Sequence, residues 1–269
     1  MRGLDAPEEM RFRRVMLLGA LATGAGLGLL FLFNPHLDLD FSGALREACG
    51  GDKRHSGWCH ENGIMIFPRY AAIALSASIV LAVFYALMRA TLRTSELFGR
   101  DQTKCLVLLA TFAIGPGLLA NVVLKDNWGR ARPREVVEFG GKLEFTPPLV
   151  PSRQCVDNCS FVSGEAASVF ALFFASALLW PQWRVALVAG GLIAGLGTGL
   201  VRISTGGHFL SDVLFAGVFM AITAVLICAL FANLSVRFRL PLNAAPLQQF
   251  ASAFADPSEH LIVKTRGHQ

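Results

Sequence analysis

Three short clusters of polar and charged residues interrupt an otherwise apolar chain of 269 residues. They occupy residues 125–133 (KDNWGRARP), 160–165 (SFVSGE) and 202–212 (RISTGGHFLSD), and each lies at the end of an apolar run. Charged groups at the ends of membrane spans are functional candidates by default, because the hydrocarbon core makes them costly. The three clusters therefore mark a candidate site.

The first cluster, the second cluster and the first residue of the third carry groups suited to a bound anion. Lys125, Arg132 and Arg202 can supply a tripod of donors for a tetrahedral oxyanion, and each arginine can bind it through two N–H groups. Ser163 and Gly164 stand just before an expected helix, where free backbone N–H groups and the helix dipole favour an anion. This combination predicts a phosphate-binding site.

The remaining polar residues supply the chemistry. His208 and Asp212 are four residues apart at the start of an expected helix, so they share a face. Asp212 can accept a hydrogen bond from one imidazole nitrogen and leave the other free as a nucleophile. Glu165 can donate a proton to a leaving alkoxide. We therefore expect phosphoryl transfer without a metal or other cofactor, since three cations already neutralise the phosphate.

The composition indicates a membrane protein, because 54% of the residues are hydrophobic and only 16% are charged. Such a chain is neither a typical cytosolic enzyme nor a disordered protein. Its net charge of +5 fits membrane orientation and anionic lipid head groups better than nucleic acid. Six apolar runs predict an all-α, six-span transmembrane helical bundle, at residues 15–33, 70–88, 105–124, 166–180, 185–201 and 209–232.

The span lengths predict that the three clusters converge. Glu165 and Arg202 are 37 residues apart, which corresponds to about 56 Å of helix, or two bilayer crossings with a turn at residues 181–184. The distribution of Lys and Arg, thirteen on one side and eleven on the other, favours cytoplasmic termini. We expect a cytoplasmic segment at 1–14, a six-span catalytic domain at 15–240, a cytoplasmic tail at 241–269 and an active site at the outer (periplasmic) face.

The cysteines agree with an outer compartment. Four of them fall in the two long outer loops, and the simplest disulfides are Cys49–Cys59 and Cys155–Cys159. A metal cluster of Cys49, His55, Cys59 and His60 is the alternative, although its spacing matches no standard zinc pattern.

Each site residue also has a plainer interpretation. A single lysine or arginine here could be an interfacial cation, and Glu165 could be an acid that complements the helix dipole. The joint occurrence of these residues at one membrane face favours the site. Arg130 and Arg134, which flank Arg132, are interpreted as solvated or lipid-contacting residues.

The clusters resemble the motifs of the type 2 phosphatidic acid phosphatase superfamily, integral membrane branch. Its first motif, Lys, six residues and Arg-Pro, is matched by Lys125 and Arg132-Pro133. Its third motif, Arg, five residues, His, three residues and Asp, is matched by Arg202, His208 and Asp212. Of the middle motif, Pro-Ser-Gly-His, only Ser163 and Gly164 remain, with Val162 in place of proline and Glu165 in place of histidine.

The resemblance implies that His208 becomes phosphorylated and that Asp212 orients it. It also implies that Lys125, Arg132, Ser163, Gly164 and Arg202 hold the phosphate. The family's middle histidine is the acid for the leaving group, so Glu165 is expected to take that role. An adjacent phosphate favours protonated Glu165, and we expect a pH profile more acidic than a histidine acid would give.

The motifs define the phosphate chemistry and leave the lipid open. The chain is similar to bacterial lipid A phosphatases of this superfamily, so lipid A is the first candidate substrate, in the bacterial inner membrane. Undecaprenyl pyrophosphate, phosphatidylglycerophosphate and phosphatidic acid are alternatives. A non-catalytic protein that binds lipid phosphates is a further hypothesis, and six spans disfavour a vanadate-dependent haloperoxidase. The sequence does not indicate an oligomeric state.

Overall fold

The computed structural model of the chain describes residues 4, 6–50, 58–59, 70, 74, 77–89 and 100–239. The described residues form helices and no strand, with one isolated bridge between Val136 and Leu143. This confirms the all-helical expectation. The main helices are α1 (Pro7–Phe33), α2 (Leu37–Ala48), α4 (Arg100–Phe112), α5 (Lys125–Asn127), α6 (Gly164–Leu179), α7 (Arg184–Ser204) and α8 (Leu210–Arg239).

Four helices of the described chain are long and apolar enough to cross a membrane: Pro7–Phe33, Asp101–Asn127, Pro181–Ser204 and Leu210–Leu234. They coincide with four of the six runs expected from the sequence. Two shorter apolar helices, Ala77–Arg89 and Gly164–Leu179, coincide with the other two. Of the expected run at 70–88, the structure describes residues 70, 74 and 77–88.

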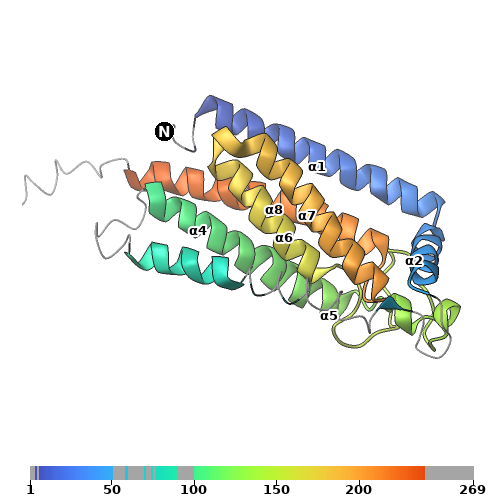
Figure 1. Cartoon of the computed structure of the whole chain (residues 1–269). Coiled ribbons are helices and arrows are strands. Elements are labelled where there is room, and N and C mark those ends of the chain that lie inside the picture. The colour runs from blue at the N-terminus through green and yellow to red at the C-terminus, as the bar shows by residue number, and fades with distance from the viewer. Residues whose placement is uncertain are drawn as a thin grey trace, which may run out of the picture.

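The helices run side by side as an elongated bundle (Figure 1). Helix α2, helix α5 and the segment 128–163 between α5 and α6 lie at one end, which we call the site end, and the first residues of α1 lie at the other. Opposite the site end, Glu9 of α1 forms an ion pair of 2.5 Å with Arg184, the first residue of α7. A short 3-10 turn, Pro181–Trp183, joins α6 to α7 and confirms the turn expected there.

Helix α6 packs against α7, α8 and α4, and most of its residues are buried. Gly191, Gly195 and Gly199 recur every fourth residue along one face of α7. A Cβ atom on Gly195 would lie 2.4 Å from Phe170 of α6, and one on Gly199 would lie 2.1 Å from Val213 of α8. Small residues at this spacing allow backbones to approach, which is how membrane helices associate tightly. The packing therefore positions Arg202, at the end of α7, relative to α6 and α8.

The third expected span contains a π-helical segment just before the site residue Lys125. Helix α4 continues into a π-helix, Ala113–Leu124, which contains Pro116 and leads directly into α5. Proline has no backbone N–H group, so regular α-helical hydrogen bonding is interrupted there. The side-chain amide of Asn121 donates to the Pro116 carbonyl at 2.7 Å. Such π segments are frequent at functional sites, and this one ends at Lys125.

Candidate active site

The structure brings the three sequence clusters together at the site end. Lys125 begins α5, Ser163 precedes α6, Arg202 lies in the last turn of α7, and Asp212 lies in the first turn of α8. The residues brought together are those expected from the sequence: Lys125, Arg132, Ser163, Gly164, Glu165, Arg202, His208 and Asp212.

The three expected cations surround one small region. Lys125 lies within electrostatic range of Arg132, Arg202 and Glu165. The Arg132 guanidinium donates two hydrogen bonds to the backbone carbonyl of Asn158, so the side chain is held in one orientation. Three like charges this close repel one another, and the single carboxylate of Glu165 balances only one of them, so the region favours a further anion. The arrangement can bind a phosphate group.

Ser163 and Gly164 lie against these cations. The Ser163 hydroxyl is buried and has no hydrogen-bond partner among the described residues, although the residue stands at the N-terminus of α6. A buried hydroxyl without a partner is costly, and a bound phosphate oxygen would satisfy it. A Cβ atom on Gly164 would lie 2.6 Å from the Asn121 amide oxygen and 3.2 Å from Lys125 Nζ. Glycine therefore gives Lys125 access to the helix terminus.

His208 has one ring nitrogen held and the other free for chemistry. Its Nδ1 lies 2.7 Å from the backbone carbonyl oxygen of Ser160 and 3.7 Å from Asp212 Oδ2. Both neighbours are acceptors, so Nδ1 carries the proton and Nε2 keeps its lone pair. The sequence predicted Asp212 as the acceptor. The closer acceptor is the Ser160 carbonyl, and Asp212 adds a negative charge behind it.

The surroundings of His208 keep the imidazole neutral. Burial lowers the pKa of His208 to about 4, with Arg202 and Lys125 acting in the same direction and Asp212 in the opposite one. Below its ordinary pKa of about 6.5 the free imidazole would be charged, whereas this one stays neutral until the pH falls towards 4. A neutral imidazole can act as a nucleophile at every pH above that value.

A conformationally special turn presents His208. Gly206 has a φ angle of +64°, a region that favours glycine, and its carbonyl oxygen accepts a hydrogen bond from the Arg134 backbone N–H at 3.2 Å. A Cβ atom on Gly206 would lie 2.7 Å from the Trp58 ring. Trp58 therefore packs directly on the turn, beside the half-cystine Cys59.

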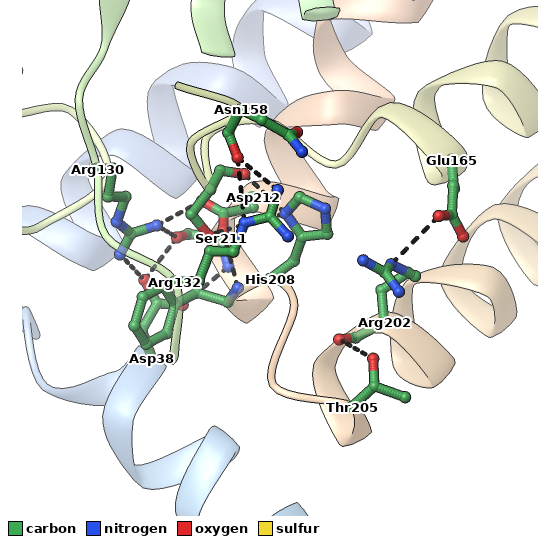
Figure 2. Close-up of polar contacts among 12 residues, drawn as sticks. Asp38, Arg130, Arg132, Asn158, Glu165, Arg202, Thr205, His208, Ser211 and Asp212 are labelled. Carbon is green, nitrogen blue, oxygen red and sulfur yellow. Dashed lines mark hydrogen bonds and ion pairs between the residues drawn. The ribbon is translucent and has the colours of Figure 1, made fainter. Parts of the chain in front are cut away.

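Glu165 faces a cation of the site. Its Oε1 atom lies 3.5 Å from Arg202 Nε, and about a quarter of the Glu165 side chain is exposed (24%). Figure 2 shows the pair on the side of His208 away from Arg130. The Glu165 carboxyl group is thus placed either to donate a proton when it is protonated or to hold Arg202 in position as a carboxylate.

The interpretation of Arg130 as solvated or lipid-contacting is wrong. Its side chain is fully buried and forms ion pairs with Asp38 at 2.8 Å and with Asp212 at 2.5 Å (Figure 2). A buried guanidinium needs partners for its donors, and these carboxylates supply them. The side chain of Arg134, by contrast, is 40% exposed, which agrees with the interpretation of this residue as solvated or lipid-contacting.

Sequence reasoning also missed Ser160, which contacts both His208 and Asp212, and Asp38, which is the partner of Arg130. Ser160 supplies the carbonyl acceptor for His208, and its hydroxyl donates to Asp212 Oδ2 at 2.5 Å. Asp38 comes from α2, more than 90 residues before Arg130 in the chain. Ser160 stands in the second cluster and could have been considered. No spacing rule connects Asp38 to residues so distant in sequence.

The cysteines form the two disulfides expected from the sequence, Cys49–Cys59 and Cys155–Cys159. Cys49 and Cys59 are thus not the metal ligands of the alternative hypothesis, whose His55 and His60 lie outside the described residues. The second disulfide closes the segment before Ser160. The Ser160 backbone N–H donates to the Arg130 carbonyl at 2.9 Å, so this segment is bound to the first cluster.

Comparisons with known proteins agree with the motifs. The chain is 38% identical over 210 residues to a lipid A 4'-phosphatase of Francisella tularensis subsp. novicida (strain U112), covering 75% of this chain and 89% of the relative. It is 34% identical over 200 residues to a lipid A 4'-phosphatase of Rhizobium leguminosarum, covering 73% and 84%. A lipid A 1-phosphatase of Rhizobium etli is 36% identical over 143 residues, covering 52% and 56%.

No solved structure matches the chain. The model of the PAP2 superfamily matches residues 103–237, which contain all eight site residues expected from the sequence. That match and the extent of the similarity to the two 4'-phosphatases lead to one conclusion: the chain belongs to the PAP2 superfamily.

Proposed function

We propose that the chain is a phosphatase of the bacterial inner membrane that removes a phosphate from lipid A through a phosphohistidine intermediate. The observation that carries the reaction class is the fully buried His208, with Nδ1 held by the Ser160 carbonyl and with Lys125 and Arg202 within electrostatic range. The names of the relatives support lipid A as the substrate.

In the first step, the substrate phosphate binds Lys125, Arg132 and Arg202. His208 Nε2 attacks phosphorus, an N–P bond forms, and the bond from phosphorus to the lipid oxygen breaks. Asp212 and the Ser160 carbonyl stabilise the positive charge that develops on the ring. Glu165 gives its proton to the leaving lipid alkoxide.

In the second step, water hydrolyses the phosphohistidine. Glu165, now a carboxylate, takes a proton from the water as its oxygen attacks phosphorus. The N–P bond breaks, and the electron pair returns to His208 Nε2. Phosphate leaves, and both the histidine and the protonated glutamic acid are regenerated. The protein side chains balance the charge at every stage, so we propose that the reaction needs no metal ion.

Glu165 can change its protonation state because its partner changes. Without substrate, its carboxylate is paired with Arg202 at 3.5 Å. A bound phosphate dianion competes for Arg202 and repels the carboxylate, and both effects favour the protonated acid. Substrate binding thereby prepares the proton donor.

The location of the site follows from the same proposal. Six spans with both termini in the cytoplasm place the site end, with its two disulfides, at the periplasmic face. Disulfides persist in an oxidising compartment, and the two bonds support this orientation. Within lipid A, we propose the 4'-phosphate, because the 4'-phosphatases match 73–75% of the chain and the 1-phosphatases 49–52%.

Phosphate release by the purified protein in detergent micelles tests this function. We expect release from lipid A to exceed release from phosphatidylglycerophosphate, undecaprenyl pyrophosphate and phosphatidic acid, and mass spectrometry of the product should show loss of the 4'-phosphate. Activity should persist in EDTA, and vanadate should inhibit it as a mimic of the transferring phosphoryl group.

Other outcomes have definite meanings. Activity that disappears in EDTA and returns with magnesium would contradict the metal-free mechanism. Faster turnover of another lipid would reassign the substrate. Binding of lipid A without phosphate release, under every condition, would leave the non-catalytic hypothesis.

A further inference from the structure

Arg130 lies in a fully buried cluster that the mechanism above does not use. Its guanidinium is divided among separate acceptors: Nε donates to the Thr146 carbonyl at 2.8 Å, Nη1 to Asp212 at 2.5 Å, and Nη2 to Asp38 at 2.8 Å. The group also lies over the ring of Phe209, 4.4 Å from its centroid. Phe209 directly follows His208, so Arg130 contacts the segment 208–212 at two points, the Phe209 ring and the Asp212 carboxylate.

Asp38 extends this cluster to a separate element. Helix α2 lies outside residues 103–237, which the family model matches, yet Asp38 is fully buried beside the start of α8. Its Oδ1 accepts the Ser211 backbone N–H at 2.8 Å, and its Oδ2 accepts the Ser211 hydroxyl at 2.5 Å. Burial raises the pKa of Asp38, so its charge depends on Arg130 and on these two donors.

The contacts form one continuous path to the nucleophile. Asp38 binds Arg130, Arg130 binds Asp212 Oδ1, and Asp212 Oδ2 lies 3.7 Å from His208 Nδ1 (Figure 2). The Ser160 hydroxyl and the Phe209 backbone N–H both donate to Asp212 Oδ2, at 2.5 and 2.8 Å. Asp212 therefore has little freedom to rotate while Arg130 is present.

We propose that Arg130 and Asp38 are positioning residues that set the orientation and the charge of Asp212 behind the nucleophile His208. This inference rests on the proposed phosphohistidine mechanism. Neither residue touches the substrate phosphate in that mechanism, and both act through Asp212.

The electrostatic consequence concerns His208 and every charged group around it. Lys125 and Arg202 face the ring as cations, Asp212 faces it as an anion, and Arg130 and Asp38 lie beyond Asp212. Arg132 and Glu165 lie on the phosphate side, in range of Lys125. Arg130 contacts Asp212 directly, so it cancels part of the field of that carboxylate at the ring. Without Arg130, the uncancelled carboxylate should favour the imidazolium.

The test measures kcat and KM on lipid A in mixed micelles, from pH 4 to 9, for a set of variants. Arg130→Gln should lower kcat by about 10²-fold with little change in KM, because the nucleophile is misplaced and the phosphate contacts remain. The acid limb of its kcat/KM profile should move to higher pH than in the wild type. Substrate ionisation is common to all variants, so the difference belongs to the enzyme.

Three further variants separate positioning from packing. Arg130→Lys keeps the charge but cannot serve separate acceptors, so kcat should fall while the acid limb stays in place. Asp38→Asn should lower kcat without moving the limb upward. The double variant Asp38→Asn/Arg130→Gln should lose less kcat than the product of the two single losses, because Asp38 and Arg130 act on Asp212 through one connected set of contacts. Arg134→Gln, at an exposed arginine just after residues 125–133, is the matched control and should retain wild-type rates.

Losses that add in the double variant, with every acid limb unshifted, would mean that the cluster only stabilises the fold, and the proposal would be overturned. If Arg130→Gln does not fold in detergent, the double variant Asp38→Asn/Arg130→Lys takes its place, and kcat losses that multiply in it would overturn the proposal. Normal kcat in both Arg130→Lys and Asp38→Asn would overturn it as well. A wild-type protein without turnover would refute the proposed function, and this inference with it. Normal turnover of the wild type, with the rates and acid limbs of all variants unchanged, would refute this inference alone.

Discussion

Replacing His208 by alanine is expected to lower kcat for phosphate release from lipid A by about 10⁴-fold or more, the scale on which other enzymes lose activity with their nucleophile. The loss of activity comes from the loss of the attacking nitrogen. His208 Nδ1 is held by the Ser160 carbonyl at 2.7 Å, and the free Nε2 is the group that attacks phosphorus in our mechanism. The Lys125, Arg132 and Arg202 side chains remain, so substrate binding should change far less than kcat.

The measurement is steady-state release of phosphate by the purified variant, together with its thermal unfolding in the same detergent. Removing His208 leaves the buried Ser160 carbonyl without this partner, which costs about 1–3 kcal/mol, so the variant should remain folded with a lower unfolding temperature. His36→Ala, at an exposed histidine before α2, is the matched control and should keep full activity. Turnover within tenfold of the wild type in His208→Ala would exclude the covalent mechanism.

Replacing Glu165 by glutamine is expected to slow phosphate release from lipid A by about 10²–10⁴-fold, the usual contribution of a general acid. The same variant should act almost normally on p-nitrophenyl phosphate, if the site accepts it, because p-nitrophenolate leaves without a proton. Glutamine keeps the size of Glu165 and can still contact Arg202. Glu165→His should restore activity on the lipid and move the pH optimum upward, because imidazole remains protonated to a higher pH than a carboxylic acid.

Two other roles for Glu165 give different results. If Glu165 only complements the dipole of α6, its loss should cost up to about 1 kcal/mol of stability and little rate. If it mainly holds Arg202 through the 3.5 Å ion pair, both substrates should be slowed equally, with a higher KM. Equal slowing of the two substrates would therefore reject the acid role.

The phosphate-binding residues could be found from the sequence because they stand at fixed spacings at span ends. Lys125 and Arg132 are seven residues apart, and Arg202 and His208 are six apart, so local chain geometry places their side chains together. The hairpin length between Glu165 and Arg202 predicted that α6 and α7 return the chain to one end, as the structure shows. The two disulfides could be predicted because each pair is close in sequence.

The buried charge cluster could not be predicted in this way. Arg130 lies two residues from Arg132, and nothing in the sequence distinguishes a solvated arginine from a buried one at that position. The difference comes from Asp38, which only the packing of α2 against the start of α8 brings within 2.8 Å of Arg130. Likewise, the Ser160 carbonyl that holds His208 is a backbone group, and residue type carries no signal for it.

The central claim, that His208 carries the phosphoryl group, can be tested by trapping the intermediate. Lipid A labelled with ³²P at the 4'-phosphate is mixed with the enzyme, the reaction is stopped with alkali within milliseconds to seconds, and the labelled peptide is mapped. We expect a label that is stable in alkali, labile in acid, located on His208, and absent from His208→Ala. Label on another residue, or steady phosphate release with no labelled protein at any time, would contradict it.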